Sequence, residues 1–179
     1  MSKVDENYLR NIAIEAVNCG AHILYLADSN GSLLPENVTQ LVQKIKDISP
    51  LEIGFHVHDN LGIAMTNSIT AVESGASFIN SSLIGMGKGT GNLTLESWLT
   101  LLNFHKKKAY YNIGKILQQT ENLKSYSFSS PVYRSTFDFL LALSNLSFEY
   151  QSLIETKISL GIEEALVTIQ ALKQKAQEI

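Results

Sequence analysis

Hydrophobic positions along the first hundred residues alternate between helical spacing and short continuous runs. The helical spacing predicts one helix ending near Gly20, a second with Pro35 in its first turn and a third closed by Gly75. The continuous apolar runs predict strands that begin near residues 22, 51 and 77, covering 22–27, 51–57 and 77–84. Strands that alternate with helices at a spacing of about 30 residues predict βα units and a parallel sheet.

Beyond about residue 108 the pattern contains no further strand and predicts only helices, at about 112–121, 135–147 and 161–177. We therefore expect two regions: an α/β region over 1–108 and an all-helical region over 109–179.

Composition narrows the classes of function. The chain has 179 residues, of which 45% are hydrophobic and 17% charged, as in a core-rich globular protein. A net charge of -3 gives no reason to expect a nucleic-acid partner, and no apolar run approaches the roughly 20 residues that cross a membrane. The single cysteine, Cys19, excludes an internal disulfide and suits a reducing cytoplasm; its place in an apolar helical pattern predicts packing rather than nucleophilic chemistry.

Polar side chains gather where each predicted strand ends. In parallel α/β proteins these carboxyl ends meet at one edge of the sheet, where functional groups collect. The candidates are Asp28 and Asn30 after the first strand, His56, His58, Asp59 and Asn60 at the second, and Ser82 at the third.

His56 and His58 are the most informative of these residues. Side chains two apart on a strand share a face, and two neutral imidazoles at that spacing can bind one divalent cation. A pair of ordinary polar residues at a strand end is the alternative.

A glycine-rich loop, Gly85-Met-Gly-Lys-Gly-Thr-Gly-Asn92, follows the third strand. Glycines such as Gly87 and Gly89 let the backbone approach a ligand, although neither standard phosphate-binding pattern is met and a flexible connector is the alternative. Asn92 is either the N-cap of the next helix or a carbonyl-oxygen metal ligand.

These motifs resemble those of the pyruvate carboxyltransferase-like, or HMG-CoA lyase-like, superfamily. The resemblance rests on His56-Val-His-Asp-Asn-Leu-Gly-Ile-Ala64 and on the glycine-rich loop through Glu96, and it covers roughly residues 20–100. The form of the loop looks closest to that of 4-hydroxy-2-oxovalerate aldolases.

The resemblance implies the C-terminal part of a (β/α)8 TIM barrel, with Mn²⁺ or Mg²⁺ at the C-terminal mouth. It implies His56, His58 and, in some members, Asn92 as metal ligands. Asp28, Asn30, Asp59, Asn60, Ser82, Gly87 and Gly89 would then surround the metal or the substrate. The implied activity is divalent-metal-dependent carbon–carbon lyase chemistry, the aldol cleavage of a 4-hydroxy-2-oxo acid to pyruvate and an aldehyde, or its reverse.

The chain departs from the family pattern in two ways. A complete barrel usually needs about 250 residues, and the Arg-Asp segment of the family's first strand has no counterpart here, so no catalytic base is assigned. The family's C-terminal tyrosine also lacks a clear counterpart, because Ser129 stands at that position and Tyr133 lies nearby.

Three interpretations remain open: the aldolase-like lyase, an acyl-CoA-dependent 2-oxo acid condensing enzyme, and a catalytically silent half-barrel that needs an N-terminal partner. The expected partners are a 2-oxo acid and an aldehyde, together with a second chain that completes the barrel or an aldehyde dehydrogenase.

Overall fold

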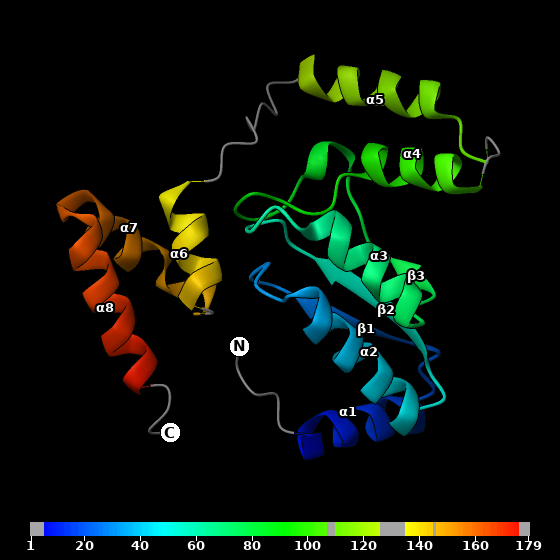
Figure 1. Ribbon diagram of the computed structural model, residues 1–179, viewed down its shortest axis with the longest axis horizontal. Helices are drawn as coiled ribbons and strands as arrows, with labels where there is room; N and C mark the ends of the chain where they lie inside the picture. Colours follow the sequence, from blue (N-terminus) through cyan, green and yellow to red (C-terminus); the bar gives the residue numbers. More distant parts are fainter. Residues whose placement is uncertain (1–5, 107–109, 126–134, 145, 176–179) are drawn as a thin grey trace.

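A three-stranded parallel sheet forms the centre of the α/β region in the computed structural model, which describes residues 6–106, 110–125, 135–144 and 146–175. The strands β1 (Ile23–Asp28), β2 (Glu52–Val57) and β3 (Phe78–Ile79) lie side by side in chain order (Figure 1). The register of β2 against β3 pairs Gly54 with Phe78. The predicted α/β class and parallel sheet are confirmed.

One face of the sheet is covered by helices. These are α1 (Glu6–Asn18), α2 (Pro35–Ile48) and α3 (Ala64–Ser74) (Figure 1). Pro35 starts α2, where the missing N–H costs nothing, and Gly75 ends α3 in the left-handed conformation with φ 112°. The core beneath them consists of buried side chains from the helices and from alternate strand positions, chiefly Leu26, Val38, Val42, Ile45, Ile53, Phe55, Val57 and Ala71.

The opposite face of the sheet is open within the described residues. Ile23, Tyr25 and Phe78 are 36%, 43% and 37% exposed, although each is a large hydrophobic side chain on a strand. The ring of Tyr25 lies across Gly54, and a Cβ at that position would collide with the ring. In a closed TIM barrel this face would line the packed interior.

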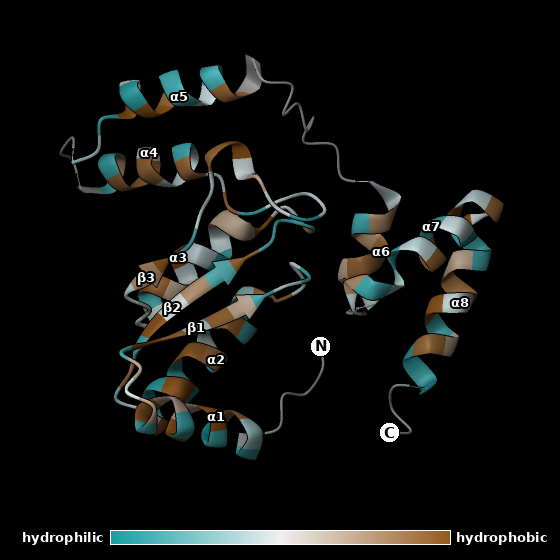
Figure 2. Cartoon of the chain, turned by 180° about the vertical axis from the view of Figure 1, so that it is seen from behind, coloured by the Kyte–Doolittle hydropathy of each residue, from teal (hydrophilic) through white to brown (hydrophobic). Residues whose placement is uncertain are grey.

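The remaining helices form two groups. α4 (Leu95–Lys106) and α5 (Ile113–Ser125) lie alongside one another next to α3, joined where the Asn103 side chain bonds the backbone of Tyr111 at 2.8 and 3.0 Å. The second group is α6 (Thr136–Ser144), α7 (Gln151–Leu160) and α8 (Ile162–Lys175), with a separate hydrophobic core that includes Phe137, Leu141, Ile154 and Ile169. Both ribbon views place α6 beyond the C-terminal ends of the strands (Figures 1 and 2).

The predicted third strand is too long. The strand itself covers only Phe78–Ile79, flanked by the N–H groups of Ser77 and Asn80, which donate to carbonyl oxygens of β2. Leu83–Gly85 form a 3-10 turn, η1. The backbone of Ser82 leaves the sheet direction because it pairs with Leu93 and Leu95 at 3.1 and 2.8 Å. An apolar sequence run does not reveal this change of partner.

Two further predictions are wrong. Helix α7 was not expected, although its sequence carries Ile154 into the core of the helical group. Cys19 is exposed rather than packed, because it follows the last residue of α1. Trp98 of α4 is buried, at 7% exposure. Among the helices that the structure describes, none combines the length and apolar character of a bilayer-spanning helix.

Candidate functional site

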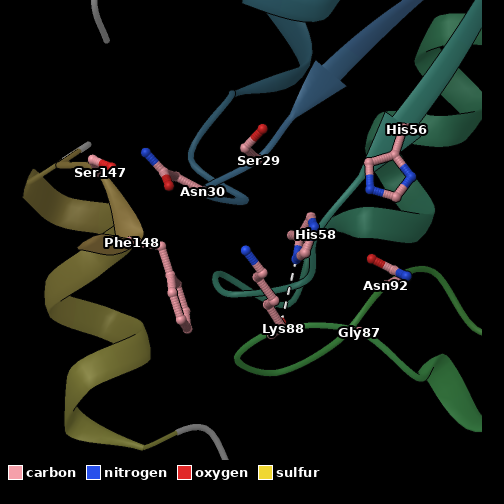
Figure 3. A pocket seen from close by; sticks show the side chains of 9 residues that line it. All are labelled: Ser29, Asn30, His56, His58, Gly87, Lys88, Asn92, Ser147 and Phe148. Atoms are coloured by element: carbon pink, nitrogen blue, oxygen red, sulfur yellow. Dashed lines mark hydrogen bonds between the residues drawn. The ribbon is translucent and has the colours of Figure 1, made fainter. Parts of the chain in front are cut away.

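The end of β2 places His56 and His58 side by side at the C-terminal edge of the sheet. Their ring centroids are 5.2 Å apart, with the ring planes at 80°. Both rings line a pocket of about 600 Å³ (Figure 3). A cavity of this volume accommodates a small organic ligand.

His56 is held in its neutral form at neutral pH. Burial disfavours the imidazolium, and a second positive charge on His58 would disfavour it further, so the pKa of His56 lies below its usual 6.5. A neutral imidazole keeps the lone pair with which it can bind a cation.

His58 is oriented by the glycine-rich loop. Its Nδ1 lies 3.3 Å from the carbonyl oxygen of Lys88 (Figure 3). When Nδ1 carries the proton it donates to this carbonyl, and the lone pair is then on Nε2. This arrangement is the one that orients metal-ligating histidines in proteins.

Asn92 brings an amide oxygen to the same pocket. Its Nδ2 donates to the carbonyl oxygen of Met86 at 2.8 Å, while its Oδ1 is buried without a hydrogen-bond partner. Gly87 makes room for this side chain, since a Cβ there would lie 2.8 Å from the amide atoms. Asn92 does not cap the next helix, because α4 begins three residues later at Leu95.

Two imidazoles and an unpartnered amide oxygen therefore meet at one edge of the sheet. Figure 3 shows His56, His58 and Asn92 around one end of the pocket. Nitrogen and neutral oxygen donors suit a divalent cation such as Mn²⁺, and a buried acceptor without a donor is costly unless a ligand satisfies it. The described residues contain no cluster of three His, Cys, Asp or Glu side chains that could bind a metal. The three residues fit the implied metal ion while leaving coordination positions for other ligands.

Asp28 organises its own loop. Its two carboxylate oxygens accept from the backbone N–H groups of Ser32 and Leu33 at 3.0 and 3.1 Å. Burial raises the pKa of Asp28, and these backbone hydrogen bonds oppose that effect. Gly31 in this loop has φ 54° and lies against the backbone of His58, where a Cβ would be 2.6 Å from the carbonyl oxygen. Asn30, from the same loop, lines the pocket.

The remaining predicted site residues brace the loops rather than line the pocket. Asp59 Oδ1 accepts from the N–H of Ala64 at the start of α3, at 2.9 Å. Asn60 is buried and accepts from the Thr90 hydroxyl at 2.7 Å. Ser82 donates through its hydroxyl to the Met86 carbonyl at 2.7 Å.

Gly89 is one point where the glycine-rich loop lies against the helical group. A Cβ at this position would lie 2.7 Å from Oδ1 of the buried Asp138 of α6 and 3.2 Å from Asn60 Oδ1. The φ of Gly89 is also positive, at 59°. The loop tip is therefore enclosed between the end of β2 and α6.

The base of the loop contains a strained residue. Ile84 has φ 51°, which is unfavourable for a β-branched side chain. Its N–H donates to the Glu96 carboxylate, at 3.1 and 3.2 Å from the two oxygens. Glu96 thus stabilises the backbone turn from which the loop and Asn92 extend.

Four pocket residues were missed by the sequence interpretation: Ser29, Lys88, Ser147 and Phe148. Ser29 and Lys88 lie inside loops that the sequence had singled out. Ser147 and Phe148 come from the helical region, and the sequence carries no local signal that they reach the strand ends. Ser129 and Tyr133, compared above with the family's C-terminal tyrosine, lie outside the described residues.

A family model described as HMGL-like matches residues 1–123. The chain is 38% identical over 95 residues to a 4-hydroxy-2-oxovalerate aldolase of Pelotomaculum thermopropionicum, covering 53% of this chain and 27% of that relative. It is 43% identical over 83 residues to a 4-hydroxy-2-oxovalerate aldolase of Spirochaeta aurantia, covering 46% of this chain and 24% of that relative. The chain belongs to the HMGL-like family, and it spans only about a quarter of the length of these relatives.

The fold is shared with a solved structure. The carboxyl transferase domain of Rhizobium etli pyruvate carboxylase, variant Y628A with pyruvate, superposes with a TM-score of 0.75 at 24% identity. The match covers 98% of this chain and 31% of that chain. It confirms the expected architecture of TIM-barrel βα units followed by a helical region.

Proposed function

We propose that this chain forms the metal-binding part of a divalent-metal-dependent carbon–carbon lyase of the aldolase kind. The observation that carries the proposal is the juxtaposition of His56, His58 and the buried, unpartnered Oδ1 of Asn92 in one pocket. The named activity of the aldolase relatives supports the same class of reaction. The proposed substrates are a 4-hydroxy-2-oxo acid, or pyruvate and an aldehyde in the reverse direction.

The proposed cation is Mn²⁺ or Mg²⁺. When bound, such an ion supplies Lewis-acid stabilisation of the negative oxygen of a pyruvate enolate. The protein's own contribution is to hold His56 neutral, to orient His58 through the Lys88 carbonyl, and to fix Asn92 through the Met86 carbonyl. Phe148 and the residues around it cover the pocket from the helical side (Figure 3).

Aldol cleavage also needs a base that takes the proton of the 4-hydroxyl group. Within the described residues the pocket is lined by no Asp, Glu or Tyr side chain. We therefore propose that the base and the Arg-Asp pair come from the strands that complete the barrel. The exposed Ile23, Tyr25 and Phe78 on the inner face of the sheet support burial against such strands, contributed by a longer polypeptide or by a second chain.

The same open face favours a second candidate, a half-barrel that is silent until its partner is present. We also propose an aldehyde dehydrogenase as the partner that takes the aldehyde product, and this rests on the family resemblance. The single cysteine supports the proposal that the protein works in the reducing cytoplasm.

The experiment is metal-dependent release of pyruvate from 4-hydroxy-2-oxovalerate. In the assembly that contains the strands completing the barrel, we expect activity that requires Mn²⁺ or Mg²⁺ and is abolished by His56→Ala, with His22→Ala as a control outside the pocket. Equal activity of His56→Ala and the native sequence would contradict the proposal. Thiol release from acetyl-CoA in the presence of a 2-oxo acid would instead identify the condensing enzyme. Lyase activity that appears only when a separate second chain supplies the missing barrel strands would identify the half-barrel.

A further inference from the structure

Lys88 is the feature of the pocket that the proposed metal chemistry leaves unexplained. Among the described residues, Lys88 is the one Lys or Arg that lines this pocket, and no Asp or Glu lines it. Its Nζ lies 5.1 Å from the centroid of the Phe148 ring, a cation–π contact. A cation that has no carboxylate beside it among the described pocket residues is a natural receptor for an anion.

The two ends of Lys88 serve different purposes. Its main-chain carbonyl oxygen contacts Nδ1 of His58, whereas its ammonium group reaches away to Phe148. The side chain can therefore be changed while the contact that orients His58 is kept. Mutation of the side chain therefore separates the role of the ammonium charge from the role of the main-chain carbonyl.

The direction of the side chain indicates which part of a ligand it would meet. Figure 3 shows the Lys88 amine between His58 and Phe148, on the side of the pocket toward Ser29 and Asn30, while His56 and Asn92 lie at the other end. A pyruvate unit held at the His56 end would leave the Lys88 end for the second half of the substrate.

We propose that Lys88 recognises a carboxylate on the aldehyde half of the substrate, so that the preferred electrophile is an aldehyde acid rather than a small neutral aldehyde. This inference rests on the lyase function proposed above and names its substrate class. The single ammonium group matches the single charge of a carboxylate, and Phe148 holds it at the far end of the pocket from Asn92. Polar groups of Ser29, Asn30 and Ser147 line the same pocket.

The test is aldol addition of pyruvate to two aldehydes of equal carbon number, succinic semialdehyde and butanal. The protein is assayed with Mn²⁺ in the assembly in which it occurs, as the native sequence, Lys88→Met and the control Lys173→Met on α8. We expect the native protein to prefer succinic semialdehyde. Lys88→Met should lower kcat/KM for that aldehyde by about 10- to 100-fold, the range for loss of a charge-assisted hydrogen bond, and leave butanal unchanged.

Further readouts separate this role from a structural one. The KM for pyruvate and the affinity for Mn²⁺ should be the same in Lys88→Met and the native protein, and Lys88→Arg should restore most of the preference. Equal loss for both aldehydes, a raised KM for pyruvate, or a preference for butanal in the native protein would overturn the inference.

Failure of the lyase proposal has a different signature. If no aldehyde reacts, the inference is decided by calorimetric titration of succinate into the metal-free protein. Binding that Lys88→Met weakens by about tenfold or more, but Lys173→Met does not, supports an anion site that is independent of lyase activity. No binding by the native protein, or equal binding by all three, overturns it.

Discussion

The contact between the glycine-rich loop and α6 makes a quantitative prediction at Gly89. In Gly89→Ala the new Cβ would lie 2.7 Å from Oδ1 of the buried Asp138, on a backbone with φ 59°. An L-residue at positive φ costs about 1–2 kcal/mol. Overpacking against a buried group adds about 1–3 kcal/mol. We expect the free energy of unfolding to fall by about 2–5 kcal/mol.

Two other glycines separate these contributions. Gly20 has φ 78° with nothing within 4 Å of an added methyl group, so Gly20→Ala should show only the backbone cost of about 1–2 kcal/mol. Gly114 lies in the first turn of α5 with ordinary φ and its nearest contact at 3.5 Å, so Gly114→Ala should stabilise the protein by about 0.4–1 kcal/mol.

The assay is urea unfolding of the three variants, followed by circular dichroism. The difference between Gly89→Ala and Gly20→Ala measures how tightly the loop tip is enclosed by Asp138 and Asn60. If the two variants lose the same stability, the loop does not pack against α6, and the argument that the helical region closes this pocket fails.

Three other outcomes follow from the site. NMR titration should give His56 a pKa below 6.5. The unfolded chain then binds the proton more readily than the folded protein, so the free energy of unfolding should fall as the pH drops below 6.5. A pKa above 6.5 would refute the assigned burial effect. Asp28→Ala leaves two loop N–H groups without acceptors and should cost about 1–3 kcal/mol in thermal unfolding, whereas no loss would refute its bracing role. Glu96→Ala should lower the free energy of unfolding by about 1–3 kcal/mol through loss of the bonds at Ile84. The exposed Glu73→Ala should lower it by less than about 0.5 kcal/mol. Equal losses in the two variants would contradict the role of Glu96 in the turn.

Sequence patterns predicted the elements whose structure is determined locally. The periodicity of α2 and α3, the start at Pro35 and the stop at Gly75 depend on neighbouring residues, and all are found. The strands β1 and β2 were found for the same reason, although Ile23 and Tyr25 of β1 are exposed rather than buried. The choice of His56, His58 and Asn92 as candidates followed from a motif, and their common pocket is a finding of the structure.

The errors in the third strand and in the lining of the pocket arose where distant residues decide the structure. Leu83 and Ile84 are apolar enough for a strand, but the carboxylate of Glu96, twelve residues beyond Ile84, stabilises a turn there. The contact of Lys88 with Phe148 joins residues sixty positions apart, and no local spacing encodes it. The part of the site contributed by the helical region was therefore invisible in the sequence.

The most direct test of the central claim is calorimetric titration of Mn²⁺ into the native protein and three single variants. The claim predicts one saturable site whose affinity falls by about 100-fold or more in His56→Ala and His58→Ala, since even outer-shell changes at metal sites cost about 10–100-fold. His22→Ala, a histidine outside the pocket, should bind as the native protein does. Equal Mn²⁺ affinity in all four proteins would contradict the account.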